Sequence, residues 1–417
     1  MISLSRRIWI VGIAATLAGL ASSAHAAAPP ESLFVWGHFN AADSGFAVTL
    51  RANPKDTLAL IRRGTLALWS NHLLQARALL DQAAKAGATK KRIAALTAES
   101  YARENDFAHA APAFREAGRE TLAMQLESLR GKQPYLIRGP DRSLVPFDQT
   151  DPLPVVRLTV NGKGPFFFLI DTGAAELVID PELADSLGMR RFGTEGGIFG
   201  GGKKANYTRG VIDSVQLGAF VVSNVPTTSL DTKRMSMAAG GRRVGGILGT
   251  HLLSRFRATL DYPASQLVLE RRGLPATELD PEVIQVPFWM AGDHYMLARG
   301  HLEQGPEVTW FIDTGLAGGA LAITPSAMAE AGIALPEGAS FDGVGGGGPV
   351  KVTPFGVKSL SVGGATGTNY MGFYGVFPAS LERGFGTRIA GIVSHGFFRQ
   401  YRLTFDFDRM KMVLAKE

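Results

Sequence analysis

The segment Phe168-Leu-Ile-Asp-Thr-Gly173 returns 142 residues later as Trp310-Phe-Ile-Asp-Thr-Gly315. In each copy an apolar run ends on an aspartate that threonine and glycine follow. A single Asp-Thr-Gly is weak evidence for any function, because so short a motif arises by chance. Two further segments return in the same order, each 145 residues later: Val244–Leu253 as Ile389–Phe398, and Arg257–Tyr262 as Arg402–Phe407. We interpret residues from about 150 onward as a duplicated β-rich unit.

Each Asp-Thr-Gly motif is expected where a buried strand opens into a tight turn. Glycine permits that turn and a close approach of backbone. The threonine hydroxyl can hydrogen-bond to backbone across the junction of the two units and hold both turns rigid. We therefore expect four residues to support the two loops: Thr172, Gly173, Thr314 and Gly315.

Two such loops facing each other would bring Asp171 and Asp313 together. Carboxyl groups that close cannot both ionise easily, so the pair shares a proton and titrates as a unit. One member can act as general base on a water, while the other donates a proton to a carbonyl oxygen. This chemistry requires no metal and no cofactor. The alternative is that both aspartates only cap turns, which leaves the matched repeats unexplained.

With these motifs the sequence resembles the retropepsin-like aspartic peptidases, as two copies fused in a bilobal, pepsin-like arrangement over roughly residues 150–417. The resemblance implies a mainly β acid-protease fold, catalytic Asp171 and Asp313, and a peptide or protein substrate. Because each lobe supplies one aspartate, it also implies a monomer.

In that family a later apolar-apolar-Gly strand braces each aspartate loop. Ile247-Leu-Gly249 matches this pattern, whereas Ile392-Val-Ser394 has serine in place of glycine. Leu316 is a second departure, since Ala174 follows the family at the matched position. Serine is small, so we expect it to be accommodated.

The family also closes hairpin flaps over its substrate. Two glycine-rich segments, Gly196–Gly202 and Gly343–Gly348, match in their distance from the aspartates. Glycine at a hairpin tip permits positive φ and mobility. Plain surface hairpins remain the alternative. The residues expected at the flaps are Phe199, Gly200, Gly201, Gly345 and Gly346.

The N-terminus has the pattern of a secretory signal peptide covering residues 1–26. Arg6 and Arg7 precede the apolar run Ile8–Leu20, and Ala24-His-Ala26 fits the small-x-small cleavage rule. An uncleaved anchor is the alternative. No later run is apolar for long enough to cross a bilayer, so we expect no stable membrane span after cleavage and a periplasmic or secreted protein.

Residues 53 to 130 have apolar side chains at helical spacing and repeat with a period of 34, which aligns Asn71 with Asn105. The period resembles tetratricopeptide repeats, which implies a possible protein partner; an ordinary helical hairpin is the alternative. Residues 139–154 are expected to form a linker. The predicted domains are a helical domain with linker over 27–145, a first protease lobe over 146–275 and a second over 276–417.

The composition and the net charge argue against several classes of function. The chain has 417 residues, 50 of them glycine and none cysteine, and its net charge is +6. Thiol nucleophiles and cysteine-ligated metals are thereby excluded, and so small a charge does not favour nucleic acid. The histidines lack His-Glu-x-x-His spacing, so no zinc site is expected, and His251 and His395 are interpreted as structural.

Two phosphate-binding motifs fail in context. Gly197–Lys203 resembles a P-loop, but Lys204 follows where serine or threonine should ligate magnesium. Gly343–Gly348 fits Gly-x-Gly-x-x-Gly, but the following Pro349 opens no helix. We therefore interpret the chain as an exported aspartic endopeptidase. The alternative function is a non-catalytic protein that binds a peptide or a partner on the same fold.

Overall fold

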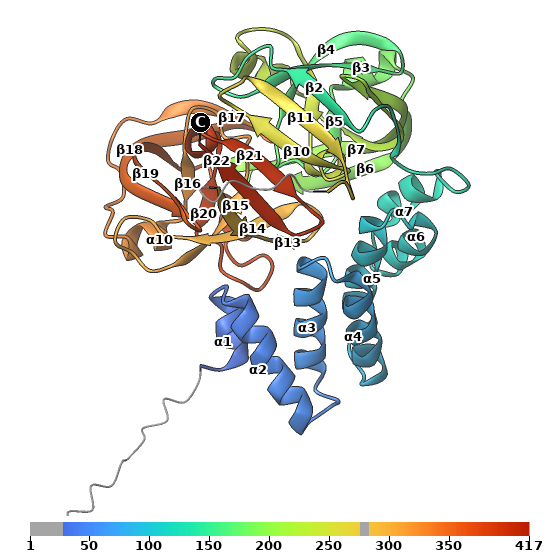
Figure 1. Ribbon diagram of the computed structural model, residues 1–417, viewed down its shortest axis with the longest axis vertical. Helices are drawn as coiled ribbons and strands as arrows, with labels where there is room; N and C mark the ends of the chain where they lie inside the picture. Colours follow the sequence, from blue (N-terminus) through green and yellow to red (C-terminus); the bar gives the residue numbers. More distant parts are fainter. Residues whose placement is uncertain (1–27, 276–282, 417) are drawn as a thin grey trace, which may run out of the picture.

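The computed structural model describes residues 28–275 and 283–416 and has a helical region followed by a β-rich part. In Figure 1 the helices (blue to cyan) lie below a β-rich body whose first half is green and yellow and whose second half is orange and red. This order of a helical region and a β-rich part confirms the sequence-based expectation. The predicted signal peptide lies outside the described residues.

Seven helices form the N-terminal region. They are α1 (Pro30–Val35), α2 (Phe39–Ala52), α3 (Thr57–Trp69), α4 (Leu73–Lys85), α5 (Lys90–Arg103), α6 (Phe107–Glu116) and α7 (Glu120–Glu127). The pairs α3–α4 and α5–α6 carry the 34-residue period. Asn71 and Asn105 sit between the helices of each pair, both with φ of 62°, a left-handed conformation that asparagine tolerates better than most residues. Helices α1 and α2 lie within the helical domain predicted over 27–145, although the repeat itself begins only at residue 53.

The first eight-stranded sheet has the order β1-β8-β5-β9-β4-β3-β7-β6, and β7 also pairs with β8. Because β7 pairs with both β3 and β8, these strands close into a barrel. The predicted hairpin of β3 and β4 is confirmed. The strands are β1 (Leu136–Arg138), β3 (Val155–Val160), β4 (Lys163–Ile170), β5 (Leu177–Ile179), β6 (Arg190–Ile198), β7 (Lys204–Leu217), β8 (Phe220–Ser229) and β9 (Val244–Leu248).

The second eight-stranded sheet has the order β13-β14-β15-β20-β16-β19-β18-β17. From β14 to β17 this order repeats that of the first sheet from β3 through β4, β9, β5, β8 and β7 to β6. The repeat seen in sequence is thus also a repeat of strand topology. The strands are β13 (Trp289–Ala291), β14 (Tyr295–Gly300), β15 (Val308–Ile312), β16 (Leu321–Ile323), β17 (Phe341–Gly345), β18 (Gly348–Val362), β19 (Ala365–Tyr374) and β20 (Gly391–Val393).

A six-stranded sheet of order β12-β22-β21-β10-β11-β2 joins the two halves. At its centre Thr259 pairs with Thr404, its own equivalent in the repeat, and their hydroxyls lie 2.7 Å apart. The stretch expected as a linker contains β2, which pairs with β11, so that expectation was wrong for these residues. The strands are β2 (Arg142–Pro146), β10 (Phe256–Asp261), β11 (Gln266–Arg271), β12 (Ile284–Pro287), β21 (Arg402–Asp406) and β22 (Lys411–Ala415).

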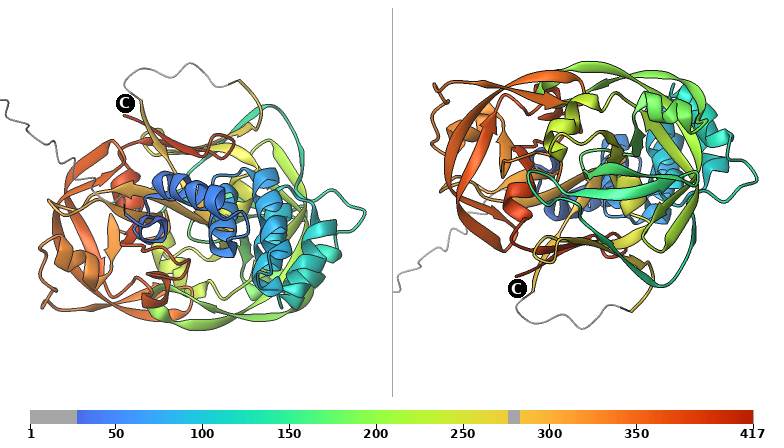
Figure 2. Two further views of the ribbon diagram at one scale, coloured as in Figure 1. Left: turned by 90° about the horizontal axis from the view of Figure 1, so that it is seen from below. Right: turned by 90° about the horizontal axis from the view of Figure 1, so that it is seen from above.

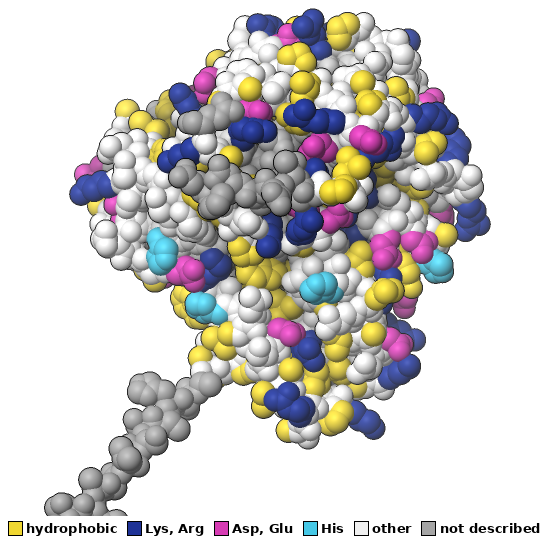
Figure 3. Space-filling view, in the orientation of Figure 1, with side chains coloured by type: hydrophobic (Ala, Val, Ile, Leu, Met, Phe, Trp, Pro, Cys, Tyr) yellow, Lys and Arg dark blue, Asp and Glu magenta, His cyan; other side chains and the backbone are white. Residues whose placement is uncertain are grey.

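Short helices complete the β-rich part. Helices α8 (Pro181–Ser186) and α10 (Pro325–Glu330) follow β5 and β16, and α9 (Thr250–Leu253) and α11 (His395–Phe398) follow β9 and β20. The 3₁₀ helices are η1 (Gly200–Gly202), η2 (Lys233–Ala239) and η3 (Ala379–Leu381). No helix in the described residues is long and apolar enough to span a membrane. Lys and Arg side chains are dispersed over the face that Figure 3 shows.

The helical region packs against the β-rich part through shared apolar contacts. Seen from below, the helices lie across the β-rich body (Figure 2). Phe39 of α2 packs on Trp289 with ring centroids 5.0 Å apart, and Trp69 of α3 packs on Phe385 at 6.2 Å. One buried cluster contains residues from both regions, which makes the helices a part of the folded body.

Arg103 at the end of α5 adds polar contacts across this interface. Its guanidinium donates to the carbonyls of Leu68, Met290 and Gly292, at 2.6, 2.6 and 2.8 Å. It also pairs with Glu99 at 2.6 Å, and burial raises the pKa of Glu99 to about 7. One side chain therefore holds two helices and a β-hairpin together.

Arg103→Ala should lower the free energy of unfolding by about 3–5 kcal/mol, because it leaves Glu99 buried without its partner. Urea unfolding followed by circular dichroism measures the change. Arg51→Ala, an exposed arginine of α2, is the control and should have little effect. Equal stabilities of the two variants would show that Arg103 does not secure the interface.

Candidate active site

The two Asp-Thr-Gly loops occupy equivalent places in the repeated topology. Asp171 follows β4 and Asp313 follows β15, and each of these strands runs parallel to the apolar strand predicted to brace it. The Asp171 N–H donates to the carbonyl of Leu248 at 3.2 Å, and the Asp313 N–H donates to that of Val393 at 3.1 Å. Each loop is therefore fixed by the strand beside it.

The threonines connect the loops to each other. The N–H of Thr172 donates to Oγ1 of Thr314 at 3.1 Å, and the N–H of Thr314 donates to Oγ1 of Thr172 at 3.0 Å. The Thr172 hydroxyl also donates to the carbonyl of Ile312 at 3.1 Å. Both threonines are fully buried. These are the contacts across the junction that the motif predicts.

The two carboxyl groups lie against each other's loops. A Cβ added to Gly173 would lie 2.4 Å from Cγ of Asp313, and one added to Gly315 would lie 2.2 Å from Cγ of Asp171. Only glycine fits at either position. Each glycine N–H donates to the aspartate of its own loop, at 2.7 Å for Asp171 and 2.8 Å for Asp313. Each carboxyl group therefore lies directly against the loop of the other aspartate.

This environment makes the pair hold a proton. Burial raises the pKa of Asp171 well above the usual carboxyl range, and the neighbouring Asp313 carboxyl raises it further. Burial also raises the pKa of Asp313, opposed by the N–H of Gly315. Both side chains nevertheless keep partial exposure to solvent. Two adjacent carboxyl groups whose pKa values are both raised favour sharing a single proton, and their partial exposure leaves them open to solvent.

The two departures from the family pattern contact each other. The Leu316 N–H donates to the Ser394 hydroxyl at 3.0 Å. In the first half the equivalent space is closed, since a Cβ on Gly249 would lie 2.2 Å from the carbonyl oxygen of Glu176. The loop between Asp313 and β16 is two residues longer than its counterpart, and the Ser394 hydroxyl bonds to that longer loop.

The glycine-rich segments form the predicted hairpin tips, β6–β7 and β17–β18. Phe199 shares an apolar cluster with Ala174 beside the Asp171 loop. Val350 shares another with Leu316 beside the Asp313 loop. Each hairpin tip thus packs next to the aspartate loop of its own half.

The two tips also touch each other. A Cβ on Gly345 would lie 3.5 Å from Cα of Gly200, and one on Gly346 would lie 2.6 Å from the ring of Phe199. Gly201 has a positive φ of 68°, whereas Gly200, Gly345 and Gly346 do not. Positive φ therefore explains only Gly201, and the close approach of Phe199 accounts for Gly346. A Cβ on Gly345 would make only ordinary contacts.

A buried polar network behind the Asp171 loop links it to the helical region. Glu176 pairs with Arg209 at 3.1 Å, and Gln125 of α7 donates to Glu176 at 3.3 Å and accepts from Arg209 at 3.2 Å. Arg209 also pairs with Glu195 of β6 at 3.0 Å, and Thr121 of α7 hydrogen-bonds to Glu195. Sequence patterns do not single these residues out, because the contacts join segments far apart in the chain.

The matched histidines have different surroundings. The Nε2–H of His251 donates to the backbone carbonyl of Asp293 at 3.2 Å, and burial lowers the pKa of His251 to about 4. His395 lies 2.9 Å from a carboxylate oxygen of Asp151. No group of three or more potential ligands within residues 28–275 and 283–416 could hold a metal ion.

The first half of the β-rich part is similar in sequence to a known protein family. Residues 156–252 match a family model described as aspartyl protease. The matched segment contains Asp171 and its bracing strand and ends before the second motif. The search of curated proteins found no match for the chain. The β-rich part thus contains a domain of the aspartyl protease kind, and the pairing with Asp313 rests on the geometry described above.

Gly249→Ala should lower the thermal midpoint, because the new methyl group meets three backbone carbonyls and forces the Asp171 loop to move, at a cost of about 1–3 kcal/mol. Gly356→Ala is the matched control, since a Cβ there meets nothing within 4 Å. Ser394→Ala keeps the Cβ and removes only the acceptor for Leu316, so its cost should be about 1 kcal/mol. Equal midpoints for Gly249→Ala and Gly356→Ala would contradict this account.

Proposed function

We propose that the chain is an aspartic endopeptidase that hydrolyses peptide bonds with a water held between Asp171 and Asp313. One observation carries the proposal: each carboxyl group lies on the glycine of the opposite loop, so that two carboxyl groups lie side by side at the junction. Burying two carboxyl groups side by side costs free energy of folding. Groups with strongly perturbed pKa values are typical of catalytic sites. The aspartyl protease match over residues 156–252 supports the same class of reaction.

In the proposed reaction the ionised member of the pair accepts a proton from the water, which attacks the carbonyl carbon of the scissile peptide bond. The protonated member donates its proton to the carbonyl oxygen, giving a tetrahedral diol intermediate. Proton transfer to the amide nitrogen then allows the carbon–nitrogen bond to break. The threonine hydrogen bonds keep the two carboxyl groups at a fixed separation during these steps, since the loops cannot move independently.

We propose that substrate lies extended between the two β-sheet halves, under the hairpins tipped by Gly200 and Gly345. The tips touch in this structure, so they would part to admit a peptide. The repeated strand order supports a bilobal, pepsin-like arrangement in which one chain supplies both acids and a monomer suffices. We also propose that the protein is exported to the periplasm or the medium. A protein partner for the tetratricopeptide-like helices is part of the same proposal.

The rival function is a binding protein without catalysis. It would be favoured if Leu316 and Ser394, the two departures from the family pattern, disturbed the Asp313 loop. The hydrogen bond between these two residues argues against this, because the second loop keeps its own contacts to the bracing strand. A binding protein also gains nothing from two buried carboxyl groups held together.

Asp171→Asn and Asp313→Asn should each reduce peptidase activity by about 10²–10⁴-fold, because neither variant has both an acid and a base. Hydrolysis of denatured casein by the purified protein at acid pH measures the loss, with and without pepstatin. Asp213→Asn, an exposed aspartate of β7, should keep full activity. Full activity in either site variant would reject the proposed pair.

Activity should follow a bell-shaped pH profile centred in the acid range and should fall as pH rises through the raised pKa of Asp171, because the pair then loses its shared proton. Stability should fall over the same interval. A carboxyl whose folded pKa is raised favours folding below its unfolded pKa, and that contribution is lost as pH rises through the folded pKa. Thermal midpoints against pH measure this without substrate.

Asp171→Asn removes the titrating partner and should flatten the loss of stability toward neutral pH. Identical pH dependence of the midpoint in the wild type and in Asp171→Asn would contradict the shared proton even if activity were seen.

A further inference from the structure

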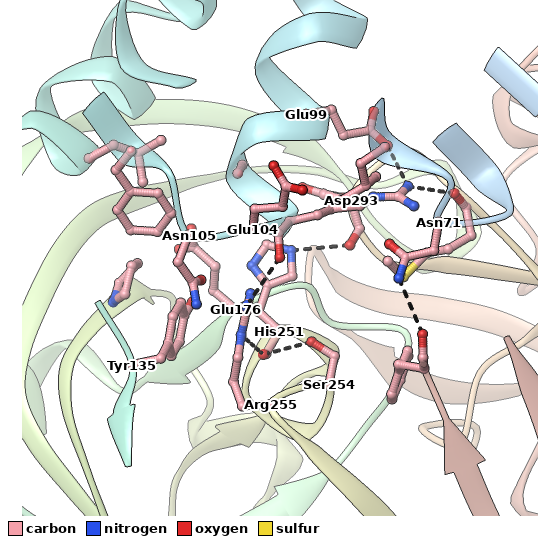
Figure 4. A pocket seen from close by; sticks show the side chains of 18 of the residues that line it. Asn71, Glu99, Glu104, Asn105, Tyr135, Glu176, His251, Ser254, Arg255 and Asp293 are labelled. Atoms are coloured by element: carbon pink, nitrogen blue, oxygen red, sulfur yellow. Dashed lines mark hydrogen bonds and ion pairs between the residues drawn. The ribbon is translucent and has the colours of Figure 1, made fainter. Parts of the chain in front are cut away.

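A cavity of about 910 Å³ lies between the helical region and the first sheet, and neither Asp171 nor Asp313 lines it (Figure 4). Its walls come from α4 to α7 on one side and from strands of the β-rich part and the segment around α9 on the other. The volume falls in the range of sites for drug-sized ligands. The cavity is therefore a candidate binding site separate from the proposed catalytic pair.

One wall of the cavity is apolar. It consists of side chains from α6, α7 and β1 with the segment before it, namely Phe107, Phe114, Leu122, Leu126, Tyr135 and Ile137. An apolar wall of this extent favours a ligand that brings a hydrophobic group with it.

Arg255 supplies a positive charge at this wall. Its guanidinium lies over the Tyr135 ring, 4.4 Å from the centroid, and donates to the backbone carbonyls of His251 and Arg103 at 3.0 and 3.4 Å. No carboxylate of the described residues forms an ion pair with it. Burial lowers its pKa, and the nearby Arg272 is already paired with Asp408, so Arg255 is the cation left for a ligand in this corner. This corner of the cavity is therefore suited to an anionic group.

Amide side chains also line the cavity, at Asn71, Gln75 and Asn105. Each carries both hydrogen-bond donors and an acceptor. A ligand that contains peptide units presents the complementary donors and acceptors.

We propose that this cavity binds a short peptide with a free C-terminal carboxylate and an apolar last residue. The carboxylate pairs with Arg255, the last side chain packs on the apolar wall, and the peptide units face the amide side chains of the lining. A simple anion would leave the wall uncovered, and an uncharged apolar ligand would leave Arg255 unpaired. The proposal does not depend on peptidase activity.

The site also adjoins the catalytic loop from behind. Glu176 lines the cavity, and its backbone carbonyl packs against Gly249 of the bracing segment. Arg209, another lining residue, contacts Glu176, Gln125 and Glu195. A ligand that contacts these residues would stabilise the Asp171 loop together with the base of the first hairpin.

Isothermal titration calorimetry of the full chain carrying Asp171→Asn, which prevents cleavage of the probe, tests the proposal. The probes are acetyl-Gly-Ala-Leu, acetyl-Gly-Ala-Phe and acetyl-Gly-Ala-Lys, each as free acid and as C-terminal amide. The Leu and Phe acids should bind one to one, and their amides at least about tenfold more weakly. The Lys acid should bind more weakly than the Leu acid.

Arg255→Gln should abolish the difference between acid and amide, and Arg255→Lys should keep most of it. Arg138→Gln, an exposed arginine of β1 outside the cavity, is the matched control and should bind as the parent does. If Arg255→Gln fails to fold, the comparison of acid with amide on the intact cavity still decides. Equal affinity of acid and amide, no binding by either apolar acid, or acid binding that Arg255→Gln leaves unchanged would overturn the proposal.

Discussion

The reciprocal hydrogen bonds between Thr172 and Thr314 are the contact on which the rest of this structure depends. Each hydroxyl accepts from the backbone of the opposite loop inside a fully buried junction, so neither loop can move without the other. That rigidity holds two carboxyl groups in one place despite their mutual repulsion. The need for glycine at residues 173 and 315 follows from this closeness, and the pKa of Asp171 is raised first by burial and then by the neighbouring carboxyl group.

Around this centre the duplicated halves have diverged in a correlated way. The first half closes tightly over Gly249, whereas the second has a longer loop and uses the Ser394 hydroxyl to hold it. The symmetry survives where strands of both halves must pair, as at Thr259 and Thr404.

The helical region belongs to the same folded body as the β-rich part. Arg103 reaches the carbonyls of a β-hairpin, and Gln125 completes the buried network behind the Asp171 loop. The interface leaves a large cavity lined by residues of both regions. The helices and the Asp171 loop are therefore physically connected through the residues that line it.

Sequence alone determined the repeated Asp-Thr-Gly loops, their bracing strands, the β3–β4 hairpin and the helical character of residues 53–130. These features can be predicted locally, because strand alternation, turn glycines and helical periodicity depend on residues that are close together in the chain. Only the tertiary structure showed that β2 pairs with β11 in the six-stranded sheet and that the Ser394 hydroxyl accepts a hydrogen bond from Leu316. It also brought Gln125, Glu176 and Arg209 into one hydrogen-bonded network. Those contacts join residues far apart in the chain, and their partners are set by packing that no short segment encodes.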